Sequence, residues 1–172
     1  MAGSLIKIAE TTVSSATASV TLTGIDSTYD VYKFIINGLT ADTDSSVVKI
    51  RVTKSGTADT TSNYDRAGKQ LKAFSTFADN ASTNETAWNI NNAGTPTNSA
   101  VNSTFYLFNF ANASEYSFAT FEEVTFDTGT NTRGLQGGGV HTVASASDGV
   151  NVFLSTGGDI DGGTFTLYGL KK

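Results

Sequence analysis

The sequence predicts an all-β protein, an antiparallel β-sandwich of about eight to ten strands with a jelly-roll-like arrangement. Apolar residues recur with a period of two, which is the period of side chains along a strand. The periodic segments are rich in Thr, Val, Ile, Phe and Tyr, which fit a pleated surface better than a helix. Turn-forming clusters such as TADTDSS and DTGTN separate them. The 172 residues suit a single domain, 1–172.

The alternation places the strands along the chain. In DVYKFIING, Tyr32, Phe34 and Ile36 share one face. In SVVKIRVTK, valine and isoleucine alternate with lysine and arginine, as a half-buried strand requires. In chain order, we expect strands at 5–10, 17–23, 30–38, 46–54, 68–74, 103–110, 115–127, 134–143, 149–156 and 163–170.

The segment STFYLFNF is apolar on both faces. Phe105 and Leu107 lie on one side, and Tyr106, Phe108 and Phe110 lie on the other. A strand with two apolar faces is covered on both. We therefore expect this strand to be central in the fold or to meet a partner.

The region 54–104 is rich in Asn, Thr, Ser and Ala, and the alternation is weakest there. Long loops in a compact domain are usually functional or covered by a partner. The region holds Trp88, Tyr64 and Phe77, which are our candidate ligand-binding residues, because sugar rings stack on flat aromatic faces. The alternative is that these aromatics cap the core or anchor a subunit contact.

The composition of the chain argues against two kinds of partner, nucleic acid and the membrane interior. The formal net charge is −5 and only 16% of the residues are charged, with scattered lysines and arginines, so the chain has no electrostatic reason to bind nucleic acid. It contains no apolar run near the roughly 20 residues of a membrane span, and its first residues do not predict a signal peptide. Cysteine is absent, which excludes disulfides and thiolate metal sites. We expect neither nucleic-acid binding nor membrane insertion.

The sequence contains few residues in the arrangements that known catalytic sites use. A Ser–His–acid site would have to use His141, the single histidine, and no serine lies in a G-x-S-x-G elbow. Glu122 and Glu123 are adjacent, so on a strand they point to opposite faces and cannot form a glycosidase pair by themselves. We expect no catalytic residues, no enzymatic activity and no cofactor.

Two short motifs contain ligand-type residues in incomplete form. Asp159 and Asp161, in DIDGG, are weak Ca²⁺ candidates, because a full loop needs more oxygens and a closing bidentate acid. The DTD segment at 42–44 lacks the same groups, and Asx-type turns are the simpler interpretation of both. The QGGG run at 136–139 lacks the lysine and helix of a phosphate loop, and indicates a bulge or the close approach of another backbone.

The order of several blocks resembles small bacteriophage virion proteins, described as capsid decoration, tail or fibre components. These blocks are STYDVYKFIINGLTADTDSSVVKIRVTKSGT at 27–57, SNYDRAGKQL at 62–71, STFYLFNFANAS at 103–114 and DGVNVFLSTGGDIDGGTFTLYGLKK at 148–172. The resemblance implies a jelly-roll-like sandwich displayed on a virion, often as a trimer. It also implies that Phe165 and Leu167 face the core and that residues 161–163 turn into the last strand.

Within that class we favour a capsid decoration, cement-like protein that binds other virion proteins, such as the major capsid or tail proteins, without covalent chemistry. Its location would be the virion, after synthesis in the host cytoplasm and release by lysis. A tail or fibre adhesin domain that binds a host-surface glycan is the second hypothesis, and a free-standing carbohydrate-binding module is the third. The low charge leaves strand edges unguarded, so we also expect neighbouring subunits to cover them.

Overall fold

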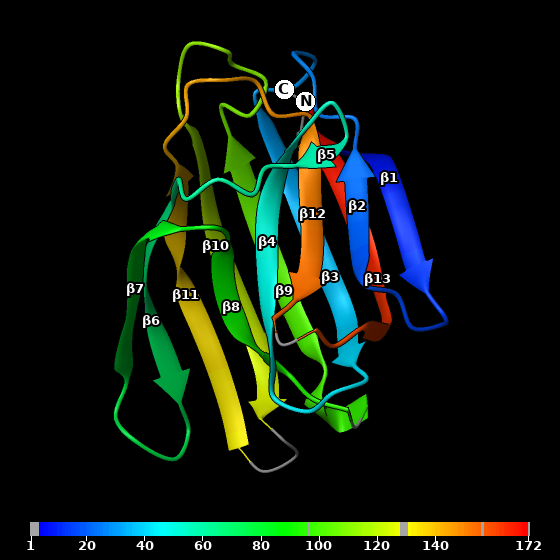
Figure 1. Ribbon diagram of the computed structural model, residues 1–172, viewed down its shortest axis with the longest axis vertical. Helices are drawn as coiled ribbons and strands as arrows, with labels where there is room; N and C mark the ends of the chain where they lie inside the picture. Colours follow the sequence, from blue (N-terminus) through cyan, green and yellow to red (C-terminus); the bar gives the residue numbers. More distant parts are fainter. Residues whose placement is uncertain (1–3, 96, 128–130, 156, 172) are drawn as a thin grey trace.

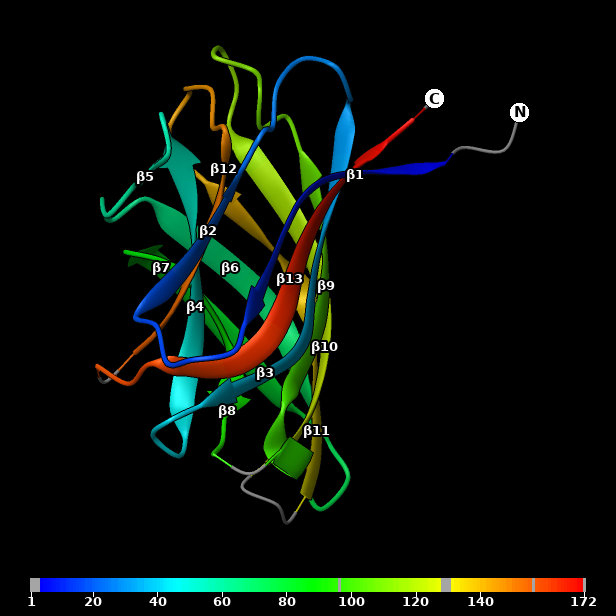
Figure 2. The ribbon, with the colours of Figure 1, turned by 90° about the vertical axis from the view of Figure 1, so that its right-hand side faces the viewer.

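The computed structural model describes residues 4–95, 97–127, 131–155 and 157–171, and shows two antiparallel sheets packed face to face (Figures 1 and 2). The described part of the chain holds thirteen strands and one 3₁₀ turn, η1 (Thr97–Ser99). The strands are β1 (Leu5–Val13), β2 (Ser19–Thr23), β3 (Val31–Ala41), β4 (Ser46–Lys54), β5 (Thr57–Ala58), β6 (Tyr64–Lys72), β7 (Ala78–Glu85), β8 (Trp88–Ala93), β9 (Val101–Phe108), β10 (Ser117–Asp127), β11 (Asn131–His141), β12 (Gly149–Leu154) and β13 (Ile160–Leu170).

The two layers differ in size. The large sheet has eight strands in the order β1-β13-β3-β9-β10-β11-β6-β7. The small sheet has the order β2-β12-β4-β5, and β8 also pairs with β4. The small sheet covers one face of the large sheet, which leaves the opposite face of β3, β9, β10 and β11 open in Figure 2. The predicted all-β antiparallel sandwich is confirmed.

The alternation of apolar residues explains the core between the layers. Tyr32, Phe34 and Ile36 share one face of β3, as predicted, and this face is the buried inner one. β4 buries Val48, Ile50 and Val52 in the same core. Phe105 packs between Phe34 and Phe121, with ring centroids 5.8 and 5.7 Å apart. Burial of one apolar side chain of this size contributes about 1.5–3 kcal/mol, so these inner faces supply most of the drive for folding.

The last strand follows the expectation in its core positions and departs from it at its start. Phe165 and Leu167 are fully buried, as expected. Residues 161–163 do not form a turn before the strand, because β13 already begins at Ile160 and shifts register at Gly162. Gly163 has φ of +124°, a conformation that favours glycine, so the bulge depends on it.

The region 54–104 differs most from the prediction. The strand expected at 68–74 is present as β6, but β5, β7 and β8 also form where loops were expected, which is why the strands outnumber the eight to ten expected. β6 (YDRAGKQLK) and β7 (ADNASTNE) lie at one end of the large sheet, beyond the cover of the small sheet in Figure 1. Because both faces of these strands are partly exposed to solvent, polar residues replace the apolar alternation that marks a half-buried strand.

Trp88 joins β8 to the large sheet. Its side chain is fully buried, its ring stacks edge-on against Tyr64 with centroids 5.5 Å apart, and its indole N–H donates to the carbonyl of Val140 at 3.3 Å. A Cβ at position 139 would lie 2.6 Å from the indole nitrogen, so Gly139 provides the space that the ring occupies. Trp88 is therefore a core residue.

Trp88→Ala is expected to lower the free energy of unfolding by about 3–5 kcal/mol, because it removes a large buried ring and leaves a cavity. Phe77→Ala, at a side chain that is 63% exposed, is the matched control and should change it by less than about 0.5 kcal/mol. Urea unfolding followed by circular dichroism measures both. Equal stability of the two variants would contradict the core role of Trp88.

Candidate functional site

The three aromatic residues predicted to bind a ligand do not share a site. Trp88 and Tyr64 have no exposed surface, so no sugar ring can stack on them, and this part of the prediction is wrong. The Tyr64 hydroxyl donates to the carbonyl of Asp59 at 2.7 Å and accepts the N–H of Val52 at 3.2 Å, which makes it a tie between β6 and β4. Phe77 alone is exposed, in the connection between β6 and β7.

His141 lies in the core beside an acid. Its Nε2 is 3.4 Å from Oδ2 of Asp59, which also binds the Lys54 ammonium at 2.7 Å. Burial lowers the pKa of His141, although the charge of Asp59 opposes this. Burial works to raise the pKa of Asp59, but hydrogen bonds from Lys54 and Thr61 outweigh it and hold that pKa well below its usual range.

The strand register adds a serine to this cluster, because Ser117 of β10 pairs with His141 of β11. Serine, histidine and aspartate are the residue types of a hydrolase triad. Ser117 and His141 are fully buried, however, so a substrate carbonyl cannot contact either of them in this structure. The geometry fits a polar cluster within the core.

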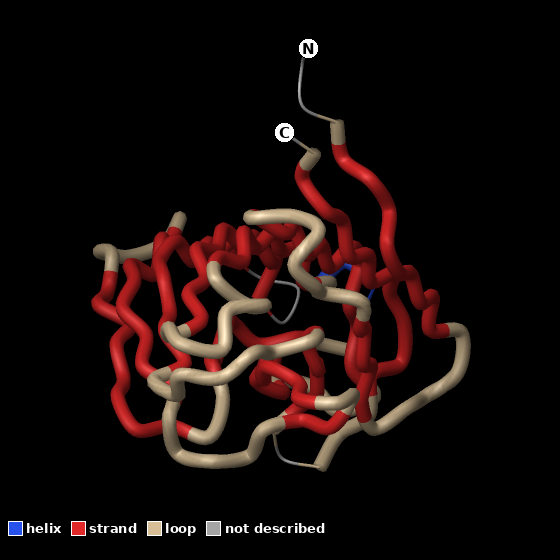
Figure 3. Tube along the Cα trace, turned by 90° about the horizontal axis from the view of Figure 1, so that it is seen from above, coloured by secondary structure: helices blue, strands red, loops and turns tan. Residues whose placement is uncertain are grey.

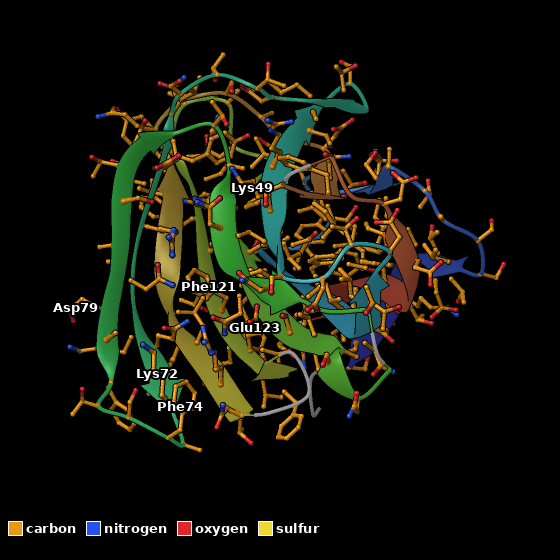
Figure 4. All side chains as sticks on the ribbon, turned by 60° about the horizontal axis from the view of Figure 1, so that its bottom comes forward. Lys49, Lys72, Phe74, Asp79, Phe121 and Glu123 are labelled. Carbon is orange, nitrogen blue, oxygen red and sulfur yellow. The ribbon has the colours of Figure 1, made fainter. Side chains whose placement is uncertain are left out.

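Glu122 and Glu123 point to opposite faces of β10, as the alternation requires: Glu122 is exposed and Glu123 is 7% exposed. The Glu123 carboxyl accepts the N–H of Asn91 at 3.1 Å and the hydroxyl of Ser103 at 3.2 Å, and Figure 4 shows it next to β8. Burial raises the pKa of Glu123 to about 7, although these hydrogen bonds oppose the rise. The carboxyl is a buried group that receives hydrogen bonds from β8 and β9.

The two aspartate motifs meet at one end of the sandwich. The N–H of Asp159 donates to Oδ1 of Asp42 at 2.8 Å, and the N–H of Asp42 donates to the carbonyl of Asp159 at 3.0 Å. One carboxylate oxygen of Asp42 is therefore occupied by a backbone N–H group, while Asp161 is exposed. Among the residues that the structure describes, no three His, Cys, Asp or Glu side chains group as metal ligands would.

The glycine run of β11 divides between the two faces. Gly137 lies against β6, where a Cβ would be 2.4 Å from the carbonyl oxygen of Ala67, so the close approach of another backbone that the sequence predicted is present. Gly139 faces the Trp88 ring on the inner side. Gly138 lies between them in sequence and faces outward, where its missing side chain leaves a depression in the open face of the sheet.

This open face carries a row of apolar side chains. Val31, Phe108, Phe118 and Val140 are consecutive partners across β3, β9, β10 and β11, so their side chains form one row. We call the outward side of these strands the outer face. Phe118 is 43% exposed, and Tyr106, Val124 and Phe126 are exposed on the same side. Exposed large side chains that are contiguous in this way mark an interaction surface.

β10 shows that the outer face is unusual for an isolated protein. Its burial alternates without interruption from Ser117 to Phe126. The outward positions include Phe118, Val124 and Phe126, whereas the inward ones include Glu123. The strand thus exposes much of its apolar surface to solvent and buries a carboxyl, which favours a partner on the outer face.

A groove of about 590 Å³ lies in the outer face over β10, β11 and β6. Phe108, Phe118 and Val140 form its apolar wall, and Gly138 and Ala67 form its floor. The remaining lining residues are Asp65, Arg66, Thr83, Ala119, Thr120 and Gly139. The groove is lined mainly by carbon, with Asp65 as a negative charge at the β6 end.

One sign of this surface is present in the sequence. STFYLFNF has two apolar faces and was expected to be central or to meet a partner, and β9 is indeed central, with Tyr106 exposed on its outer side. Phe110 does not join that side. β9 ends at Phe108 and Asn109 adopts φ of +61°, which turns Phe110 into the core.

Comparison with protein-family models, with curated proteins and with solved structures finds no significant match. Within the residues described, no helix has the length and apolar character that a membrane span requires.

The buried carboxyl makes stability depend on pH. The pKa of Glu123, about 7 in the folded chain, exceeds the 4.5 of an ordinary glutamate, so folding favours the protonated form. Its stabilising contribution is complete below pH 4.5 and is lost as pH rises to about 7. Glu123→Gln stays neutral and should raise the free energy of unfolding at pH 8 by about 1–3 kcal/mol, measured by urea unfolding at pH 5 and pH 8.

Glu122→Gln is the control, because that side chain is exposed on the same strand, and it should show the pH dependence of the parent chain. His141 acts in the opposite direction: its pKa is lowered on folding, so its contribution is lost as pH falls below 6.5. Removing the Glu123 carboxyl should therefore unmask a rise in stability from pH 5 to pH 8. A Glu123→Gln variant that is less stable than the parent at pH 8 would contradict the assignment.

Proposed function

We propose that this chain is a bacteriophage virion structural protein displayed on the particle surface, with capsid decoration as its role. Two lines support the proposal. The spaced blocks at 27–57 and 148–172 resemble small virion proteins. The fold is an all-β sandwich, which is the architecture that the resemblance implies.

The observation that carries the proposal is the apolar outer face of the large sheet. An open face that exposes Phe118, Tyr106 and Val124 is suited to lasting attachment to another protein surface. The titratable side chains His141 and Glu123 are buried on the inner side of the same sheet. Attachment through the outer face would therefore be non-covalent. The partners would be other virion proteins and further copies of this chain in a trimer, and the location would be the virion.

If the outer face attaches the protein to the particle, purified protein should bind particles of the encoding virus that lack it, at a fixed ratio, and raise their melting temperature. Phe118→Asp should reduce this binding at least tenfold, because it places a charge in the middle of the apolar row. Co-sedimentation and calorimetry of the particles measure both effects.

Phe77→Asp is the matched control, since Phe77 is exposed but lies in the β6–β7 connection, away from the row. Its particle binding should be unchanged. The proposal fails if neither the parent nor the control binds particles, or if Phe118→Asp binds as well as the parent while remaining folded.

A second candidate is a host-glycan adhesin, which the exposed β6–β7 connection supports. Phe77 is 63% exposed and Phe74 is 46% exposed, and the Arg133 guanidinium lies 5.4 Å from the centre of the Phe74 ring. Figure 4 shows Phe74 and Lys72 at the end of β6. Aromatic rings beside charged groups at a hairpin tip offer stacking and hydrogen bonding to a sugar.

In this alternative, Phe77→Ala should weaken glycan-array or host-cell binding by about tenfold, because one stacking ring contributes about 1 kcal/mol or more. Particle binding should not change. An array on which the parent chain binds no glycan would remove this candidate.

A further inference from the structure

The paired ends of β1 and β13 form an arm that leaves the body of the sandwich. Leu5 pairs with Leu170, and the N–H of Lys171 donates to the carbonyl of Ser4 at 3.0 Å, so residues 4–6 and 169–171 form a two-stranded ribbon. The last β13 residue that pairs with β3 is Gly169, opposite Tyr32. Beyond it, the ribbon projects on the side of the outer face (Figures 2 and 3).

The arm is apolar on both of its sides. Leu5 is 44% exposed and Ile6 is 40% exposed, and because they are adjacent on a strand they point in opposite directions. A projecting two-stranded ribbon has little stability of its own in water. Exposed aliphatic side chains at such a position are suited to insertion into an apolar groove.

The groove over Gly138 and Ala67 has the features that would receive this arm. It is open and apolar, and it lies on the side toward which the arm projects. Its charged end also complements the arm: Lys171 is exposed at the arm, and Asp65 lines the groove. Oδ1 of Asp65 accepts the N–H of Asn84 at 2.7 Å, which fixes the carboxylate at the groove end.

The arm is far from the Ala67 end of the groove in its own chain. In the strand order β1-β13-β3-β9-β10-β11-β6, six steps separate Leu5 of β1 from Ala67 of β6. At about 4.8 Å for each step the separation is about 29 Å. Contact between arm and groove therefore requires two molecules.

We propose that the arm of one copy docks in the groove of a second copy of this chain. Leu5 and Leu170 lie above Gly138 and Ala67, and Lys171 approaches Asp65. The inference rests on the oligomeric part of the proposed function and names the surfaces that would form it. Since each copy has one arm and one groove, the contact is head-to-tail, and such contacts form a closed ring or an open filament according to the rotation between copies. The expected trimer is the ring of three copies.

Cysteine cross-linking tests this contact directly, because the parent chain contains no cysteine. A chain carrying both Leu5→Cys and Ala67→Cys should form disulfides between molecules under mild oxidation, and non-reducing electrophoresis should show covalent species of up to three chains. A disulfide within one chain is excluded, because it requires Cα atoms less than about 7 Å apart. Mixing the two single variants should give a covalent dimer that neither gives alone.

Leu5→Cys combined with Val124→Cys is the matched control. Val124 is exposed on the outer face of β10, but it is six residues from Phe118, about 20 Å along the strand. This pair should cross-link at the background rate of random collision. Cross-linking of the Leu5–Ala67 pair no faster than the control overturns the proposal.

Leu5→Asp supplies a second measurement without oxidation. It should weaken self-association at least tenfold in sedimentation velocity while the unfolding midpoint of the monomer is unchanged, because Leu5 is exposed in the single chain. A parent chain that stays monomeric at high concentration would overturn the inference. These experiments use purified protein alone, so they are independent of particle binding. If self-association is absent but the protein binds particles, the proposed function stands and the arm–groove contact does not. If the protein self-associates through the arm but does not bind particles, the arm–groove contact stands and the proposed function does not.

Discussion

The packing of one indole against one glycine holds the two layers of this sandwich together on the β11 side. β8 is hydrogen-bonded to β4 in the small sheet, and its link to β11 is the Trp88 ring seated on Gly139. With β8 in this position, Glu123 and His141 are closed off from solvent. The same packing fixes the position of β11. The neighbouring residue of that strand, Gly138, faces outward and forms part of the floor of the groove. A side chain at Gly139 would displace the ring, and with it the arrangement of both faces of the large sheet.

The sequence predicted those strands whose two faces differ in polarity. β3 over 31–36 and β4 over 46–52 alternate because one face meets the opposing sheet. In β13, Phe165 and Leu167 follow the same period, although Thr166 between them is also buried. β7 was missed, and β6 was predicted only in part, as a strand at 68–74, because both extend beyond the small sheet, where hydration of both faces removes the apolar period. Pairing of β6 with β11 and of β7 with β6 places them in the sheet, and this pairing has no local signature in the chain.

The site was harder to predict than the fold. Trp88 stands alone in a polar region, which is also how an exposed binding residue would appear, and the β11 glycine that buries it is some fifty residues away in sequence. In β10, Phe118, Val124 and Phe126 lie on one face and Phe121 lies with Glu123 on the other. By hydrophobicity alone the first set would be assigned to the core. Pairing with β9 and β11 reverses that assignment, since Phe121 fits the aromatic cluster of Phe105.

This reversal connects the stability of the chain with its interaction surface. A slip of one residue in β10 would bury Phe118 and Val124, but it would also replace Phe121 in the core and face Glu122 inward. The observed register keeps the aromatic cluster, at the cost of a buried carboxyl inside and an exposed phenylalanine outside. A partner on the outer face covers the exposed phenylalanine but leaves the carboxyl buried. The open face is therefore stabilised by assembly and the buried carboxyl is not, so a gain in stability on binding should be the same above and below the pKa of Glu123.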